Sequence, residues 1–278
     1  MTRNEKTGGD RIYTPLQSLE IKGSAGDPLP QVWKSLPTRF LRGQLGLVCA
    51  APGIGKSGFI LTYVVKARVP TFYFSADSNP FTQLSRMVSI HTGLPMEASK
   101  KQVRSRDLGD AGVELNGIPV RFGYDASPSL DQIETSLEAY DEVYGDFPSM
   151  VVIDNITNVR GISGDEDDPF SGLEAMMDYL HDMARKTGAF VVGLHHVQGK
   201  YNDGNIPIPL GGVKGQITRV PELVLTLHRV QSEFGPDRLN VSTVKDRDGN
   251  GDPSGLSFAS LEFIGDSMTI RDFSSSNT

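Results

Sequence analysis

Residues 50–58 read Ala-Ala-Pro-Gly-Ile-Gly-Lys-Ser-Gly and lie between an apolar run, Leu45–Ala50, and an amphipathic run, Lys56–Ala67. The segment matches the phosphate-binding pattern G-x-x-x-x-G-K-[ST], except that alanine stands first. The glycines let the backbone curl so that N–H groups point at a phosphate beside a helix N-terminus. A chance glycine-rich turn is the alternative. The segment predicts strand, loop and helix, with a nucleotide held by Ala50, Ala51, Pro52, Gly53, Ile54, Gly55, Lys56, Ser57 and Gly58.

Three side chains supply the chemistry that such a loop needs. Lys56, which we expect to be an exposed loop lysine, can neutralise phosphate oxygens, and the Ser57 hydroxyl can bind Mg²⁺. Asp154 ends the apolar run Met150–Asp154, where a second metal ligand is needed. A strand-end aspartate is common at turns, but its combination with the loop is specific. The sequence therefore predicts ATP and Mg²⁺ as cofactors, with Ser57 and Asp154 as metal ligands.

The composition is that of a globular protein. The chain has 278 residues, with 27 Lys and Arg against 34 Asp and Glu, a formal net charge of −7 and 38% hydrophobic residues. One cysteine, Cys49, excludes an intramolecular disulfide framework and cysteine-clustered metal sites. The acidic balance argues against indiscriminate coating of nucleic acid. No apolar run of about eighteen residues and no secretory signal occur, so we expect no membrane contact and a cytoplasmic location.

Apolar and amphipathic runs alternate along the first two thirds of the chain, which predicts an α/β fold with a mostly parallel sheet flanked by helices. Capping-box patterns at Ser129 and Ser171 open two of the helices. Runs 221–230, 239–245 and 258–264 have no helices between them and predict antiparallel C-terminal strands. We divide the chain into a mobile arm (1–30), one domain (31–272) and a disordered tail (273–278). Strands are predicted at 45–50, 70–75, 118–122, 150–154 and 190–194, and helices at 56–67, 81–91, 130–144 and 171–183.

The loop, the strand-end aspartate and their order resemble the RecA-like P-loop ATPase core of hexameric replicative helicases. The resemblance covers roughly residues 33–265 and is nearest to the DnaB type and its compact RepA-like phage and plasmid relatives. In that family a carboxylate after the next strand activates the attacking water. Asp77, in Ser75-Ala-Asp-Ser78, occupies this place, although the family usually has glutamate there. The resemblance therefore implies Asp77 as the catalytic base, and the alternative is that Asp77 caps the helix beginning near Pro80.

The resemblance also gives roles to residues at two further strand ends. His195 and His196 correspond to a γ-phosphate sensor, with His196 nearer the nucleotide; the alternative is a pair of ordinary strand-end histidines, one of them buried. Lys245 and Arg247 lie in Val244-Lys-Asp-Arg-Asp-Gly249, which resembles the family's Lys-x-Arg-x-Gly segment. They alternate along a strand and so share one face. The resemblance implies that both reach the γ-phosphate of a neighbouring subunit, and solvated strand-end charges are the alternative.

Two loops are candidates for lining a DNA channel. The first spans residues 155–169 and carries Arg160; the second spans residues 198–216, is glycine-rich, and carries Lys200 and Lys214, with Arg219 just beyond it. We expect both loops to be mobile and these cations to contact phosphates without reading bases. The acidic run 165–168 fits such a channel poorly and is predicted to be solvated.

Together these features predict an ATP-dependent DNA helicase or translocase acting on single-stranded DNA in replication. The resemblance implies head-to-tail assembly into a ring or filament, typically a hexamer, and other replication proteins as partners. One alternative is a RecA-like recombination or structure-specific DNA-processing protein, with or without nuclease activity. Another is an ATP-dependent loader or switch that does not unwind DNA. The single tryptophan, Trp33, is interpreted as a core or subunit-docking anchor rather than a nucleotide-stacking residue.

Overall fold

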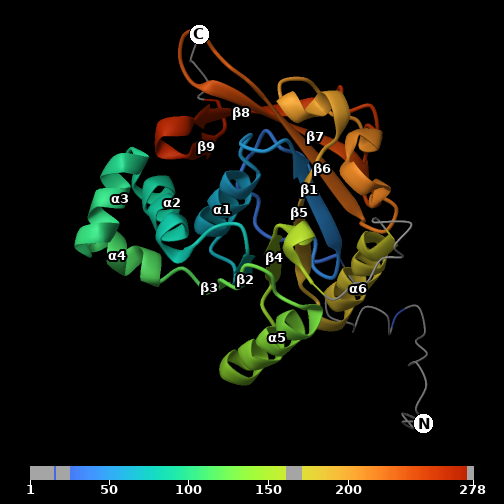
Figure 1. Cartoon of the computed structure of the whole chain (residues 1–278), viewed down its shortest axis with the longest axis horizontal. Coiled ribbons are helices and arrows are strands. Elements are labelled where there is room, and N and C mark those ends of the chain that lie inside the picture. The colour runs from blue at the N-terminus through green and yellow to red at the C-terminus, as the bar shows by residue number, and fades with distance from the viewer. Residues whose placement is uncertain (1–15, 17–25, 161–170, 274–278) are drawn as a thin grey trace.

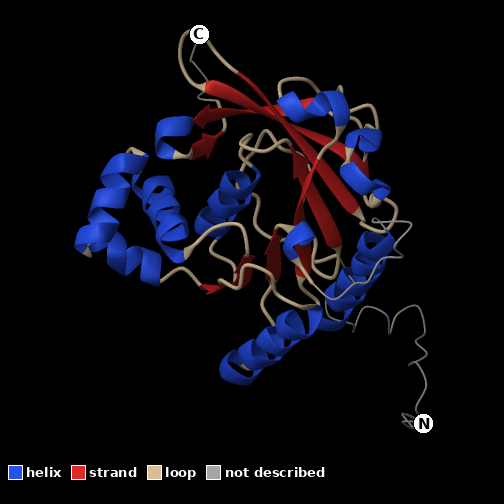
Figure 2. Cartoon of the chain, viewed as in Figure 1, coloured by secondary structure: helices blue, strands red, loops and turns tan. Residues whose placement is uncertain are grey.

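A nine-stranded sheet organises the computed structural model, which describes residue 16 and residues 26–160 and 171–273. Its strand order is β3-β2-β4-β5-β1-β6-β7-β8-β9. Helices cover both faces of the first half of the sheet, whereas the last strands follow one another directly (Figures 1 and 2). The predicted α/β fold, with a largely parallel sheet and antiparallel C-terminal strands, is confirmed.

The glycine-rich segment joins strand β1 (Leu45–Ala50) to helix α1 (Lys56–Ala67), as predicted. Strand β1 is buried along its whole length and lies between β5 (Phe190–His196) and β6 (Leu223–Val230). A strand with neighbours on both sides and covered faces requires apolar residues throughout, which explains the uninterrupted apolar run. The other parallel strands are β2 (Thr71–Ser75), β3 (Val120–Gly123) and β4 (Met150–Asp154).

The order of the strands decides which face of the sheet each helix covers. The chain moves toward one edge from β1 to β3 and returns from β3 to β5. Right-handed crossovers therefore place α1, α2 (Pro80–Thr92), α3 (Met96–Ser105) and α4 (Gly109–Asn116) on one face. They place α5 (Leu130–Tyr144) and α6 (Ser171–Thr187) on the other, and Figure 1 shows α1 to α4 apart from α6 across the strands. Because these strands are parallel, their carboxyl ends share one edge, where ligands bind in such sheets.

The strongest helix signal in the sequence is confirmed in full at α5. The Ser129 hydroxyl accepts a hydrogen bond from the Gln132 N–H (3.1 Å), and the Gln132 side chain accepts one from the Ser129 N–H (2.8 Å). Helix α6 begins at Ser171, where the second capping-box pattern was found. Helices α3 and α4 were not predicted: α3 is polar and buries only Ser99, so it has no apolar stripe to reveal it.

The three C-terminal runs form strands, but they do not all pair in one direction. Strand β6 is parallel to β1 on one side and antiparallel to β7 on the other, so it joins the two parts of the sheet. Strands β7 (Asp237–Asp246), β8 (Phe258–Ile264) and the unpredicted β9 (Thr269–Arg271) then pair antiparallel in succession. The β6–β7 pairing sets Asp246 opposite Leu223, at the start of β6.

The segment before β1 packs on the domain through its apolar residues. Trp33 is 2% exposed, stacks on Phe59 of α1 and donates a hydrogen bond from Nε1 to the Ile270 carbonyl (3.2 Å). Leu29 is also buried, and its N–H bonds to the Phe40 carbonyl. Trp33 is therefore a core residue, and the folded part of the described chain includes Leu29, before the proposed boundary at residue 31. Within the described residues, no helix is long and apolar enough to cross a membrane.

Candidate functional site

The predicted phosphate-binding loop, residues 50–58, has the backbone that its glycines were expected to provide. Gly53 and Gly55 have φ values of 76° and 124°, in the region that favours glycine. Lys56 is only 7% exposed, and its Nζ donates to the carbonyls of Ala50 (3.0 Å) and Ala51 (3.3 Å). The expectation of an exposed loop lysine is therefore wrong, because the loop folds around the ammonium group. Burial lowers the pKa of Lys56, and nearby Cys49, Asp154 and Asp77 oppose that change.

Asp154 is a buried carboxylate beside the loop. It is 1% exposed, and its Oδ2 accepts a hydrogen bond from the Tyr73 hydroxyl (2.9 Å). Its Oδ1 has no hydrogen-bond partner among the described residues. Burial raises the pKa of Asp154, while the hydroxyls of Ser57 and Tyr73 hold it down. A buried carboxylate oxygen left over beside a serine hydroxyl fits Mg²⁺, which takes few protein ligands and completes its shell with phosphates and water.

Asp77 lies in the turn after β2, next to Asp154. Ser75 pairs with Asp154 across the strands, and the N–H groups of Ala76 (2.8 Å) and Asp77 (3.2 Å) both donate to the Asp154 carbonyl. The Asp77 side chain is exposed and lines the cavity over the loop. The alternative role for Asp77 as a helix cap is wrong, because Asn79 is the N-cap of α2 and accepts from the Thr82 N–H (2.9 Å).

The two histidines at the end of β5 have different surroundings. His196 pairs with Ala50 at the start of the loop, lines the cavity, and lies 3.2 Å from Asn155 Nδ2 through its Nε2. Burial, and then the charge of Lys56, lower the pKa of His196. His195 is fully buried, its Nε2 is 2.8 Å from the Lys214 carbonyl, and burial lowers its pKa to about 4. Neutral His195 therefore donates to the second loop, while His196 faces the loop that would hold phosphate.

These strand ends surround a cavity of about 400 Å³ over the phosphate-binding loop. Asp77, His196 and six of the nine predicted loop residues line it, namely Pro52, Gly53, Gly55, Lys56, Ser57 and Gly58, whereas Ala50, Ala51 and Ile54 do not. Sequence reasoning missed the remaining lining residues, since they come from separate strands and helices with no shared local motif: Arg86, Asn155, Arg229, Phe263, Gly265 and Met268. The Arg229 guanidinium lies 5.2 Å from the centre of the Phe263 ring. A planar cation next to an aromatic ring suits contact with a base.

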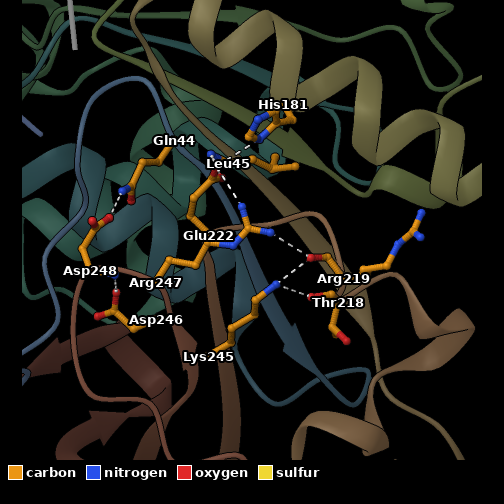
Figure 3. A network of polar contacts seen from close by, with 10 residues as sticks. All are labelled: Gln44, Leu45, His181, Thr218, Arg219, Glu222, Lys245, Asp246, Arg247 and Asp248. Carbon is orange, nitrogen blue, oxygen red and sulfur yellow. Dashed lines mark hydrogen bonds and ion pairs between the residues drawn. The ribbon is translucent and has the colours of Figure 1, made fainter. Parts of the chain in front are cut away.

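Lys245 and Arg247 lie where strands β1 and β6 begin, at the edge of the sheet opposite the phosphate-binding loop. Figure 3 shows the polar contacts that they make there. Asp246 is level with Leu223, which is level with Gly46, whereas the phosphate-binding loop follows Ala50. Four residues of strand span roughly 13 Å, at about 3.3 Å per residue. An arginine side chain is too short to cross that distance, so neither cation reaches the loop of its own chain. Both were predicted to act on the nucleotide of a neighbouring subunit.

Each of the two cations is bonded to the segment just before β6. Lys245 Nζ donates to the carbonyls of Thr218 and Arg219 (2.7 Å each), and Arg247 Nη2 donates to the Arg219 carbonyl (3.1 Å). Burial, and then the charge of Arg247, lower the pKa of Lys245. The two side chains therefore lie on the same side of the strand end, as their alternation predicted, and converge on one carbonyl group.

The four cations predicted to contact DNA phosphates do not lie together; they are Arg160, Lys200, Lys214 and Arg219. Exposed Lys200 and Lys214 are on the second loop, which forms the short 3₁₀ turns Gly199–Asp203, Leu210–Gly212 and Lys214–Gln216. Arg219 lies at the other edge beside Lys245, with its Nε 3.8 Å from Glu174, and Arg160 Nε donates to the Ser127 carbonyl (2.6 Å). Residues 161–170, including the acidic run, lie outside the described residues.

The second loop is packed rather than free-standing, in contrast to the mobile loop expected from its glycines. Val197 pairs with Val213 across its base, and Ile208 within it is fully buried. Gly204 has a φ of +69°, and a Cβ there would come within 2.2 Å of the Ile54 side chain. The loop therefore lies directly on the phosphate-binding segment.

Comparisons with known proteins identify the family of the chain and its relatives. A family model described as an AAA domain (AAA_25) matches residues 13–201. The Gene 65 protein of Mycobacterium phage L5 is 63% identical over 266 residues, which cover 94% of this chain and 99% of that protein. The Gene 65 protein of Mycobacterium phage D29 is 63% identical over 228 residues, 82% of this chain and 98% of that protein.

Two solved structures share the fold at low sequence identity. A DnaB-like replicative helicase, described together with its interactions with primase, superposes with a TM-score of 0.72 at 18% identity, over 84% of this chain. The match spans 60% of that helicase chain. A second solved structure, described as an ATPase domain, superposes with a TM-score of 0.71 at 17% identity, over 84% of this chain and 86% of that domain. The RecA-like core of the DnaB type, expected from the sequence motifs, is thus the observed fold, and the chain belongs to the AAA-domain family AAA_25.

Proposed function

We propose that the chain is an ATP-hydrolysing motor that translocates on single-stranded DNA as a replicative helicase. In this proposal residues 50–58 bind the triphosphate, Ser57 and Asp154 hold Mg²⁺, Asp77 activates water, and His196 senses the γ-phosphate. The grouping of the loop, Asp77 and His196 around one cavity, with Asp154 beside it, supports these roles. Arg229 and Phe263 are proposed to contact the base.

The main support for the motor proposal is that Lys245 and Arg247 lie far from the cavity of their own chain. Lys245 and Arg247 lie at the edge where strands β1 and β6 begin. Four strand residues, or roughly 13 Å, separate that edge from the loop of their own chain. Two chains in head-to-tail contact can place this edge of one against the cavity of the next, which is the heterologous arrangement that closes into rings. A guanidinium delivered in this way stabilises charge on the transferring phosphate.

The second loop supports a coupling between nucleotide and DNA. It bonds to His195, lies on Ile54, and presents Lys200 and Lys214 to solvent. We propose that these two lysines, together with Arg160, contact the DNA backbone, and that Arg219 belongs to the Arg247 site rather than to the DNA path. Two relatives come from Mycobacterium phages, so we propose the host cytoplasm as the place of action.

One experiment tests the motor activity, the need for ATP and Mg²⁺, and the assembly of the chain together. We expect Mg²⁺-dependent ATP hydrolysis that single-stranded DNA stimulates, measured beside the native mass of the assembly, and ATP-dependent displacement of a paired strand. Stimulated hydrolysis without displacement would favour the loader or switch. Cleavage of branched DNA with Mg²⁺ and no ATP would favour the DNA-processing alternative.

A further inference from the structure

Glu222 is a buried acidic residue that no predicted motif contains. It is 7% exposed and lies between the segment 217–221 and strand β6 (Figure 3). Its backbone bonds to two other elements, since its N–H donates to the Leu45 carbonyl (3.0 Å) and its carbonyl accepts from the Arg247 N–H (3.0 Å). Glu222 therefore sits between the start of β1 and the residue proposed to act on the neighbouring nucleotide.

The carboxylate of Glu222 faces groups from three elements. Oε2 accepts a hydrogen bond from the Leu45 N–H at 3.0 Å. Oε1 lies 3.1 Å from Nδ1 of His181 on α6 and 3.6 Å from Nη1 of Arg247. One oxygen is thus held by the backbone of β1, and the other faces both the His181 ring and the Arg247 guanidinium. A carboxylate fixed in this way acts as an anchor whose position the sheet determines.

The guanidinium of Arg247 is held on one side and open on the other. Its side chain is 48% exposed even though Nη1 is near Glu222 and Nη2 donates to the Arg219 carbonyl. Lys245 donates to the same carbonyl. Arginine has five N–H donors in a planar fork, so donors remain for a phosphate after these contacts are made.

We propose that Glu222 is the positioning residue for Arg247: its carboxylate holds the guanidinium at the sheet edge, ready to meet the γ-phosphate of the next subunit. The inference rests on the proposed function, in which Arg247 acts across a subunit contact. A long side chain without an anchor samples many rotamers, and misplacement by about 1 Å can cost ~10²-fold in rate. Glu222 itself touches neither nucleotide nor metal in this proposal.

The test compares two carboxylates with matched surroundings. Glu222→Gln keeps an amide oxygen that accepts from the Leu45 N–H but loses the charge that faces Arg247. Glu262→Gln is the control, because Glu262 is also buried and bonds to a half-exposed arginine (Arg271, 2.6 Å). Glu262 pairs with Arg238, at the end of β7 that is remote from Arg247.

In assembled protein with saturating DNA, we expect Glu222→Gln to lower kcat for ATP about 10- to 100-fold, with KM and nucleotide affinity within twofold of wild type. Glu262→Gln should leave kcat unchanged. A double-mutant cycle with Arg247→Ala, run at enzyme concentrations that make its turnover measurable, should show no further loss from Glu222→Gln.

Three outcomes would overturn the inference. Unchanged kcat in Glu222→Gln removes the positioning role, as does an equal loss in the wild-type and Arg247→Ala backgrounds, and an equal loss in Glu262→Gln shows a general structural effect. These results are distinct from failure of the proposed function itself. If Arg247→Ala is fully active in a confirmed oligomer, the trans-acting arginine is absent, and the role of Glu222 falls with it.

Discussion

Asp77 and Asn79 are two residues apart in one turn and have separable tasks. Asn79 caps α2, so its replacement should lower the stability of the fold, whereas Asp77 caps no helix. We predict that Asp77→Asn keeps nucleotide affinity and thermal stability but loses turnover about 10²- to 10⁴-fold, because an amide cannot accept the proton of the attacking water.

Asn79→Ala is the matched variant, predicted to lose about 1 kcal/mol of stability while turnover per folded molecule persists. Denaturant unfolding beside steady-state hydrolysis separates the two. Reversal of the two phenotypes would contradict the assignment of Asp77 as the base.

Lys56 calls for a substitution that respects its burial. Because its side chain is enclosed by the loop, truncation to alanine would leave a gap, so Lys56→Met is the better variant. We predict abolished hydrolysis with a melting temperature close to wild type, measured by phosphate release and thermal unfolding. Lys66→Met on the same helix is the control and should keep its turnover. Hydrolysis near the wild-type rate in Lys56→Met would remove the phosphate-binding assignment.

At the scale of elements, His195 ties the end of β5 to the second loop, and its burial makes that contact sensitive to acid. The pKa of His195 is about 4 in the folded chain, against about 6.5 for an unfolded histidine. Between these values the unfolded state binds a proton that the folded state does not, so stability falls as pH decreases from 6.5 to 4 and is unaffected above 6.5.

The difference corresponds to a loss of about 3 kcal/mol at most. His195→Gln retains an N–H donor for the Lys214 carbonyl and does not titrate. We therefore predict a flatter dependence of the unfolding free energy on pH in this variant, measured by urea unfolding between pH 4 and pH 7. An unchanged slope would show that His195 is not the titrating group.

Elements with a strong local signal were predictable, and those defined by distant pairing were not. Strand Met150–Asp154 and helix Lys56–Ala67 have the predicted bounds because an apolar run or a helix start next to a glycine loop is encoded in adjacent residues. Strand β9 has three residues and exists through pairing with β8, which leaves little pattern to detect.

The residues of the candidate site also fall into two groups, those that the sequence predicts and those that it does not. Its phosphate-binding loop, Asp77, Asp154 and His196 stand at ends of strands that the sequence marks, so their meeting followed from the parallel sheet. Arg229 and Phe263 reach the cavity from β6 and β8, two strands that are not neighbours in the sheet. No local spacing relates them, and only the antiparallel meander brings them over the loop.

At the scale of the whole molecule, the proposed site is split between two edges of one sheet. The loop lines the cavity, whereas Arg247 lies at the edge where β1 begins, with 48% of its side chain exposed. An assembly in which each contact joins the cavity of one chain to the Arg247 edge of the next has one complete site per contact. Loss of the guanidinium should then abolish hydrolysis without loss of ATP binding.

Mixing two inactive variants tests this arrangement directly. Arg247→Ala is predicted to lose about 10³- to 10⁵-fold in turnover while it binds ATP normally. Lys56→Met lacks the loop lysine but still offers its guanidinium. In an equal mixture about a quarter of head-to-tail contacts join an intact loop to an intact arginine, so turnover should reappear.

Mixing Arg247→Ala with a Lys56→Met/Arg247→Ala double variant is the control and should stay inactive, because no contact is complete. Fluorescence energy transfer between labelled chains verifies that subunits exchange. With exchange verified, an inactive mixture would mean that hydrolysis needs several intact contacts at once. Full activity of Arg247→Ala alone in a confirmed oligomer would show that Arg247 does not act on the neighbouring site.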